Sequence, residues 1–155
     1  MDTPDVENIA RAIAADYGNR PDGLIEILHR LQAAVGYVPA QAVQVLADAL
    51  NLSRAEVHGV VTFYHDFRHE PAGRHVLKLC RAEACQSMGA DALMAGVEQR
   101  LGVACGHTTT DGNLTLEPAY CLGLCATAPS GMLDGRVVGR LNPDRVARLL
   151  HEVGA

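Results

Sequence analysis

The sequence CRAEAC occupies residues 80–85, and the sequence CLGLC follows at residues 121–125. These two short stretches contain four of the five cysteines in the chain, namely Cys80, Cys85, Cys121 and Cys125. A cysteine thiolate is reactive unless something occupies its sulfur. Two such pairs in one small chain therefore indicate that the four sulfurs bind a common group.

Three kinds of occupant are compatible with a Cys-x4-Cys pair followed by a Cys-x3-Cys pair. A [2Fe–2S] cluster accepts four thiolates at wide and varied spacings. Structural zinc usually has about two to four residues between paired ligands and often includes a histidine. Two disulfides or free thiols are the third possibility, although an odd number of cysteines argues against a disulfide framework. The gaps of four and three residues lie toward the wide end of the zinc range and neither stretch contains a histidine, so the pattern favours the [2Fe–2S] cluster over zinc and over disulfides.

Both cysteine pairs follow segments that we expect to be β-strands. Residues 75–80 alternate apolar and polar side chains and end on Cys80, while residues 114–120 lead into Cys121. Apolar side chains at four-residue steps over residues 93–101 predict a helix between the two strands. A loop that carries the first cysteine pair should connect the first strand to this helix. The order of strand, cysteine loop and helix is half of a thioredoxin-like fold, with both pairs at one end.

The remaining C-terminal sequence completes this domain. Asp134 and Gly135 form a dipeptide that is typical of two-residue hairpin turns, so residues 130–133 and 136–139 should pair as short antiparallel strands. Asn142 followed by Pro143 predicts the start of a last helix, which buries its apolar side chains inward. Residues 71–155 should therefore form an α/β layer structure.

Residues 1–70 have the apolar spacing of helices. Short amphipathic helices are expected after residues 3, 21, 39 and 53, and Ser53 with Glu56 has the pattern of a capping box. The Glu70-Pro71 step breaks the helical pattern and places a domain boundary there. The expected fold class is α/β, with an N-terminal helical bundle of about four short helices (1–70) and a thioredoxin-like [2Fe–2S] domain (71–155).

Several stretches around the cysteines extend this interpretation. They are VVTFY at residues 60–64, PAGRH at 71–75, LCRAEACQ at 79–86, YCLGLC at 120–125, and Pro129. With them, most of the chain resembles the 24 kDa-type subunits of NADH:quinone oxidoreductase, a family of thioredoxin-like [2Fe–2S] proteins. The Arg-Ala-Glu-Ala sequence inside the first pair resembles the gamma subunits of NAD-dependent formate dehydrogenases.

The resemblance implies a role and a set of partners. It implies that Cys80, Cys85, Cys121 and Cys125 bind the cluster, and that the cluster exchanges electrons with the flavin of an NAD-linked dehydrogenase complex. An FMN- and NAD-binding flavoprotein subunit would be one partner. Through the formate dehydrogenase branch, a large molybdenum- or tungsten-containing catalytic subunit would be another.

Two alternatives remain open. The chain could be the corresponding subunit of respiratory complex I or of an NAD-linked hydrogenase, or it could be an interaction module that carries structural zinc. No Gly-rich phosphate loop follows a strand, and the thioredoxin Cys-x-x-Cys motif is absent. We therefore expect this chain alone to bind no nucleotide and to turn over no substrate.

The composition of the chain limits its expected partners and its expected location in the cell. The net charge is −5 and there is no basic run, which argues against a nucleic-acid partner. No apolar run reaches the roughly 18 residues of a membrane span, and the acidic N-terminal sequence does not resemble a signal peptide. We expect a cytoplasmic protein that does not insert into a membrane.

Three further residues are candidates for metal binding. Cys105 could be a fifth ligand or a disulfide partner, but an unpaired thiol near a loop is the favoured interpretation. His65 and His69 have the i, i+4 spacing of residues that share a helical face. No carboxylate stands at the metalloprotease spacing beside them, so we expect both histidines to be solvated or satisfied by other contacts.

Overall fold

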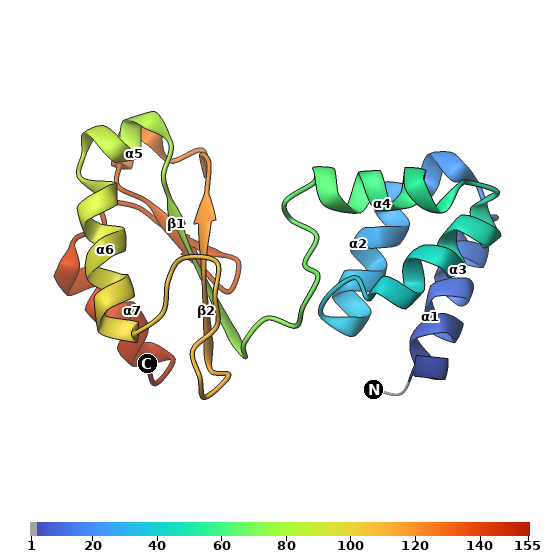
Figure 1. Ribbon diagram of the computed structural model, residues 1–155. Helices are drawn as coiled ribbons and strands as arrows, with labels where there is room; N and C mark the ends of the chain where they lie inside the picture. Colours follow the sequence, from blue (N-terminus) through green and yellow to red (C-terminus); the bar gives the residue numbers. More distant parts are fainter. Residues whose placement is uncertain (1–2) are drawn as a thin grey trace. The chain divides into compact units, whose positions relative to one another are not determined.

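The chain divides into two compact units, each with its own hydrophobic core. The computed structural model describes residues 3–155, and its contacts separate Met1–Pro71 from Ala72–Ala155 (Figure 1). Within residues 3–155, no helix combines the length and the apolar composition needed to cross a membrane. The first unit contains only helices among its described residues, and the second combines a sheet with helices.

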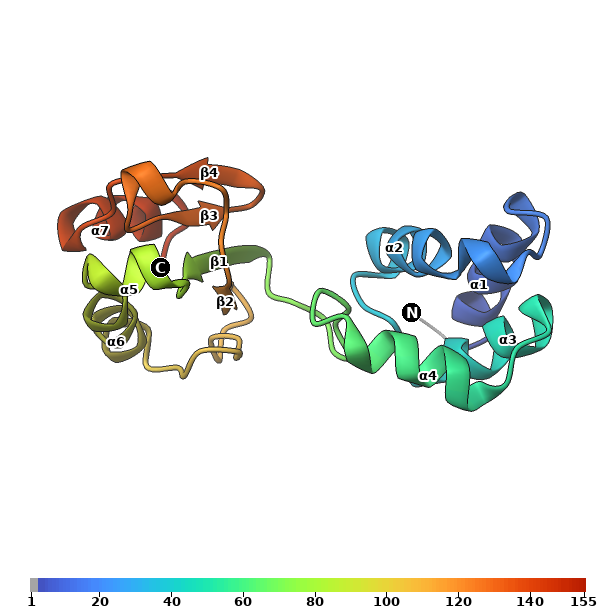
Figure 2. The same ribbon diagram turned by 90° about the horizontal axis from the view of Figure 1, so that it is seen from above.

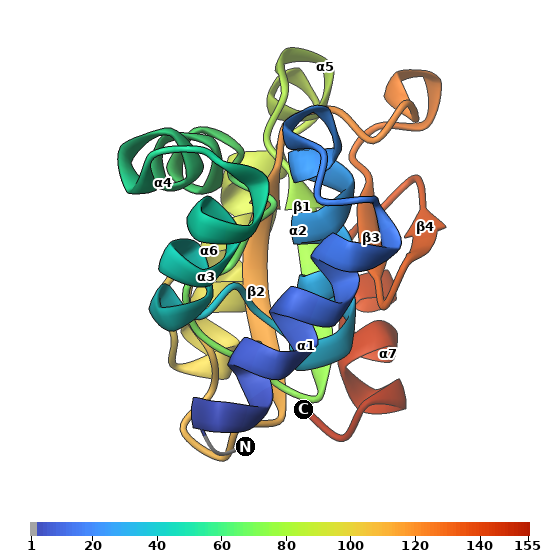
Figure 3. The same ribbon diagram turned by 90° about the vertical axis from the view of Figure 1, so that its right-hand side faces the viewer.

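Four α-helices make up most of the first unit. They are α1 (Thr3–Asp16), α2 (Leu24–Val35), α3 (Ala40–Leu50) and α4 (Arg54–Phe63), and a short 3₁₀ helix, η1 (Pro21–Gly23), precedes α2. Helix α1 packs against both α2 and α3 (Figure 3). The apolar stripes predicted from the sequence form the core, in which Ile27, Leu28 and Leu31 are fully buried.

The ends of these helices follow from local residue choices. Helices α2 and α3 end at Gly36 and Asn51, whose left-handed φ angles of 93° and 54° suit these two residue types. The predicted capping box opens α4. The Ser53 hydroxyl accepts from the Glu56 N–H at 3.2 Å, and the Ser53 N–H donates to the Glu56 carboxylate at 2.8 Å. This backbone N–H and the Ser53 hydroxyl lower the pKa of Glu56.

The second unit is built on a four-stranded sheet. Its strands are β1 (His75–Cys80), β2 (Leu114–Ala119), β3 (Gly131–Leu133) and β4 (Arg136–Val138), in the order β2-β1-β3-β4. Strands β1 and β2 are parallel, and the other two pairings are antiparallel. Helices α6 (Ala90–Leu101) and α7 (Pro143–Glu152) lie on the same face of the sheet (Figure 2).

Alternation along the central strands determines which side chains form the core. Leu77, Leu79, Leu114 and Leu116 all point to the helix-covered face, where they pack with Met94 and Val97 of α6 and with Val146, Leu149 and Leu150 of α7. On the opposite face, Lys78 and Glu117 form an ion pair at 3.4 Å. The sheet is therefore apolar on one face and at least partly polar on the other.

The predicted hairpin joins β3 to β4. Asp134 and Gly135 form its turn with φ angles of 50° and 83°, the left-handed pair that a type I′ turn requires. The Asp134 carboxylate accepts hydrogen bonds from the Val76 N–H at 2.8 Å and from His75 Nδ1 at 2.8 Å. Partial burial would raise the pKa of Asp134, but these contacts outweigh burial and lower it.

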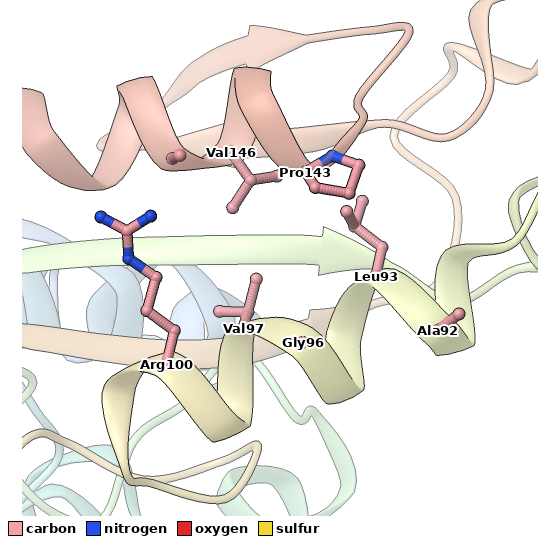
Figure 4. Close-up of a pocket in the computed structure, with 8 residues that line it drawn as sticks. Ala92, Leu93, Gly96, Val97, Arg100, Pro143 and Val146 are labelled. Carbon is pink, nitrogen blue, oxygen red and sulfur yellow. The ribbon is translucent and has the colours of Figure 1, made fainter.

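A pocket lies between helices α6 and α7 (Figure 4). Leu93, Val97 and Arg100 line it from α6, and Pro143 and Val146 line it from α7. No cysteine lines this pocket, so it does not belong to the site predicted from the sequence.

Candidate metal centre

The parallel pairing of β1 and β2 brings the two cysteine pairs to one end of the sheet. Cys80 is paired with Ala119, and the Arg81 N–H donates to the Ala119 carbonyl at 2.7 Å. Cys121 follows Ala119 by two residues. The two pairs therefore emerge at the same edge of the sheet, as the strand predictions required.

The first pair is buried. Cys80 ends β1, and Cys85 lies on a short helix, α5 (Glu83–Ser87); their exposed fractions are 2% and 1%. The sequence predicts a plain loop here, so this helix is a correction. Alanine, glutamate and glutamine favour helix, and the Gln86 N–H closes a turn on the Ala82 carbonyl at 2.9 Å.

The second pair is exposed and closely spaced. The sulfurs of Cys121 and Cys125 are 3.6 Å apart, and Cys125 begins a 3₁₀ helix, η2 (Cys125–Thr127). A metal–sulfur bond of about 2.3 Å with tetrahedral angles places two thiolates about 3.8 Å apart. The spacing of Cys121 and Cys125 therefore suits two ligands of one metal ion.

Backbone N–H groups converge on the sulfur of Cys80. Burial would raise the pKa of this thiol, but the N–H groups of Ala82, Cys121 and Leu122, together with the Cys85 thiol, outweigh burial and lower it. Cys121 has a left-handed φ of 80°, which is uncommon for a residue other than glycine. Consecutive N–H groups next to a left-handed residue form a concave anion site, and here they face a sulfur.

The four sulfurs influence one another electrostatically. The hydrogen bond and negative charge of Cys121 raise the pKa of Cys125, with smaller contributions from burial, Cys85 and Cys80. Four thiolates in one place repel each other unless a cation neutralises them, and a bound metal ion deprotonates its thiols outright. Both the donor chemistry and the arrangement in two pairs fit a [2Fe–2S] cluster.

The other sequence candidates lie elsewhere. Cys105 is a half-buried free thiol packed against the core of the α/β unit, and burial, followed by the charge of Glu98, raises its pKa. His65 and His69 are exposed. Across residues 3–155, no group of three or more His, Cys, Asp or Glu side chains surrounds a point where a single metal ion would sit.

One residue at the site was missed by the sequence analysis. The Ser130 hydroxyl lies 3.5 Å from the Cys85 sulfur, and the Ser130 carbonyl accepts from the Cys80 N–H at 2.9 Å. No motif singles out this serine. Its proximity to both cysteines follows from the pairing of β3 with β1, which the sequence did not predict.

Comparison with known proteins identifies the class. The thioredoxin-like [2Fe-2S] ferredoxin family matches residues 10–154, and the chain belongs to this family. The cofactor that this family carries is a [2Fe–2S] cluster.

Relatives of the chain are parts of larger assemblies. One subunit of the NADH-quinone oxidoreductase of Pseudomonas aeruginosa is 37% identical over 81% of this chain and 76% of its own length. The NADP-reducing hydrogenase subunit HndA of Solidesulfovibrio fructosivorans is 34% identical over 83% of this chain and 75% of its own. A crystal structure of an NAD⁺-reducing [NiFe]-hydrogenase matches 84% of this chain with a TM-score of 0.71 and 27% identity, but the match covers only 22% of the hydrogenase chain.

Proposed function

We propose that this chain is an electron-transfer subunit of an NAD-linked oxidoreductase complex, with Cys80, Cys85, Cys121 and Cys125 as the ligands of one [2Fe–2S] cluster. The observation that carries the proposal is the arrangement of the four sulfurs as two pairs at one end of the sheet, beside the N–H groups that face Cys80. Membership of the ferredoxin family supports the same cluster.

The protein's own groups would set the properties of the centre. The bound cluster supplies a site that accepts and releases one electron. The N–H groups that face Cys80 favour negative charge on its sulfur, whereas Arg81 contributes little free positive charge because Asp91 pairs with it at 3.2 Å. All four proposed ligands are cysteines, so we expect a low reduction potential rather than the higher range that histidine ligands give.

Exposed apolar side chains near the cysteines suggest where a partner docks. Tyr120, immediately before Cys121, is 74% exposed, and Met88, at the end of α5, is 61% exposed. Tyrosine and methionine are both enriched at protein interfaces relative to the rest of the protein surface. We propose that this end of the α/β unit faces the FMN- and NAD-binding flavoprotein subunit, so that the electron passes over a short distance.

The helical unit has a second exposed apolar surface. Phe63 is 72% exposed, and its neighbour Tyr64 is 43% exposed. Together with Leu24, Leu52 and Val60 they line a shallow pocket. We propose that this surface also contacts the flavoprotein subunit.

The parent complex is the finer part of the proposal. The Arg-Ala-Glu-Ala sequence within the first pair favours a cytoplasmic formate dehydrogenase, in which a molybdenum- or tungsten-containing subunit oxidises formate. The alternative is the corresponding subunit of complex I or of a hydrogenase, and the relatives support this alternative equally well. Co-purification of the parent complex from the native organism, followed by assays of NAD reduction with formate and with hydrogen, distinguishes a formate dehydrogenase, a hydrogenase and complex I.

Two measurements test what all three parent complexes have in common, namely the [2Fe–2S] cluster and the flavoprotein partner. Anaerobically purified protein should be red-brown and contain two iron atoms and two acid-labile sulfides per chain, as a single [2Fe–2S] cluster requires. A colourless protein with stoichiometric zinc would contradict it. Affinity purification after co-expression with the flavoprotein subunit should recover both chains with flavin and iron, and recovery of the chain alone at every salt concentration would contradict the docking.

A further inference from the structure

Three buried polar side chains occur among the described residues of the α/β unit, and only one of them contacts a cysteine sulfur. Asn113 donates to the Val153 carbonyl at 2.8 Å. The Thr115 hydroxyl accepts a hydrogen bond from the Gly73 N–H at 2.7 Å and shares a second hydrogen bond with the Thr108 hydroxyl. These two connect segments of backbone. Ser130, 2% exposed, instead directs its hydroxyl at the Cys85 sulfur, 3.5 Å away.

The backbone fixes the position of Ser130. Strand β3 begins at the next residue, Gly131, which is paired with Leu79 of β1. The Ser130 carbonyl extends this pairing by accepting from the Cys80 N–H at 2.9 Å. A Cβ atom on Gly131 would lie 2.8 Å from the Lys78 carbonyl oxygen, so only glycine allows this close approach. Ser130 is thus held beside both cysteines of the first pair by the sheet.

The protonation state of Cys85 as a metal ligand decides the direction of its hydrogen bond with Ser130. A metal-bound cysteine is a thiolate and has no proton to donate. The Ser130 hydroxyl has one proton, and the sulfur is the polar atom that it reaches. The hydroxyl must therefore donate, and the thiolate must accept.

We propose that Ser130 raises the reduction potential of the centre by donating a hydrogen bond to the Cys85 thiolate. The inference rests on the proposed function, in which Cys85 is a ligand. One-electron reduction adds one negative charge, part of which resides on the ligand sulfurs. A donor to a sulfur stabilises the reduced state more than the oxidised state, because hydrogen bonds to more negative acceptors are stronger. Ser130 acts through Cys85 and is a positioning residue.

The test compares variants of the full-length, cluster-loaded protein. Midpoint potentials are measured by spectroelectrochemical titration, with the visible spectrum recorded on the same samples. Ser130→Ala should lower the ratio of reduced to oxidised cluster several-fold at a fixed applied potential, where a tenfold change corresponds to about 59 mV for one electron. An unchanged midpoint in a variant with an intact spectrum would overturn the proposal.

Ser87→Ala is the matched control. Ser87 follows Cys85 by two residues, and its hydroxyl donates to the Ala84 carbonyl at 2.9 Å rather than to a sulfur. The same substitution there should leave the midpoint at the wild-type value. If both variants shifted the midpoint equally, the effect would not come from the bond to Cys85, and the proposal would be wrong.

A second pair of variants covers the case in which Ser130→Ala does not hold its cluster. Ser130→Thr and Ser130→Val introduce side chains of nearly equal volume, and only threonine retains the hydroxyl. The valine variant should have the lower midpoint, and equal midpoints would overturn the proposal. Failure of the proposed function looks different, because the wild-type protein would then lack iron and sulfide altogether.

Discussion

Cys80 and Ala119 are directly paired across the parallel strands β1 and β2. This one pairing places the second cysteine pair, which begins two residues after Ala119, beside the first. The N–H groups of Cys121 and Leu122 can then reach the sulfur of Cys80. The geometry of the candidate centre therefore depends on the register of two strands that are distant in the sequence.

Replacement of the proposed ligands provides the most direct test. Each of the variants Cys80→Ser, Cys85→Ser, Cys121→Ser and Cys125→Ser should lose or damage the cluster, because serine offers a poorer ligand than a thiolate. Iron and acid-labile sulfide analysis, together with the visible spectrum, measures the loss. Cys105→Ser is the control and should retain full iron and sulfide. Bleaching by Cys105→Ser, with retention by one of the other four, would refute the ligand assignment.

Gly139 should tolerate no side chain. A Cβ atom there would overlap Thr127 Oγ1 and lie only 2.8 Å from Thr127 Cβ. Gly139→Ala must therefore displace η2, which contains Cys125, and should destabilise the protein by about 1–3 kcal/mol and reduce its iron content. Urea unfolding and iron analysis measure both effects.

Gly96→Ala is the matched control for this steric effect. Gly96 lies inside α6, and a Cβ atom there meets nothing within 4 Å. The variant should keep its iron and gain up to about 1 kcal/mol, because alanine favours helix over glycine. A Gly139→Ala protein as stable as Gly96→Ala would show that the contact with Thr127 is not restrictive.

The Asp134 carboxylate should make stability depend on pH. Its pKa is lowered in the folded state, mainly by the Val76 N–H and His75 acting against burial. The resulting stabilisation is present above the ordinary carboxyl pKa of about 3.9 and is lost as pH falls through the lower folded value. Asp134→Asn, which suits the left-handed turn equally well, should be less stable than wild type near neutral pH. In urea unfolding, the difference between the two proteins should stay constant from neutral pH down to about 5 and then shrink as pH falls further, through the lowered pKa of Asp134; a difference that does not change below about pH 5 would contradict this origin.

The capping box of α4 should contribute measurably to stability. Ser53→Ala removes the hydroxyl that accepts from the Glu56 N–H and should cost about 1 kcal/mol in urea unfolding. Ser53→Thr retains the hydroxyl, which both accepts from the Glu56 N–H and donates to the Glu56 carboxylate, and should recover most of the loss. Equal stability of the alanine and threonine variants would indicate that this cap is not important.

Local patterns in the sequence predicted most of the secondary structure. Helix periodicity, the Ser53 cap and the Asp134-Gly135 turn act over a few neighbouring residues, so they can be recognised without knowing the fold. The short helix α5 was missed because a single turn leaves too little periodicity to detect. The sheet order was also not predicted, because the pairing of β3 with β1 depends on contacts between distant segments.

The cysteine spacing by itself favoured a [2Fe–2S] site and left zinc and disulfides or free thiols open, since four thiols in two short pairs have few stable uses other than metal binding. Only the tertiary structure decided how that site is built. The register of β1 and β2 brings the pairs together, the left-handed backbone at Cys121 is found beside them, and β3 carries Ser130 to the sulfur of Cys85. The spacing of residues in the sequence shows which ligand atoms lie close together within one segment. The distances between different segments are set by the packing of the whole sheet.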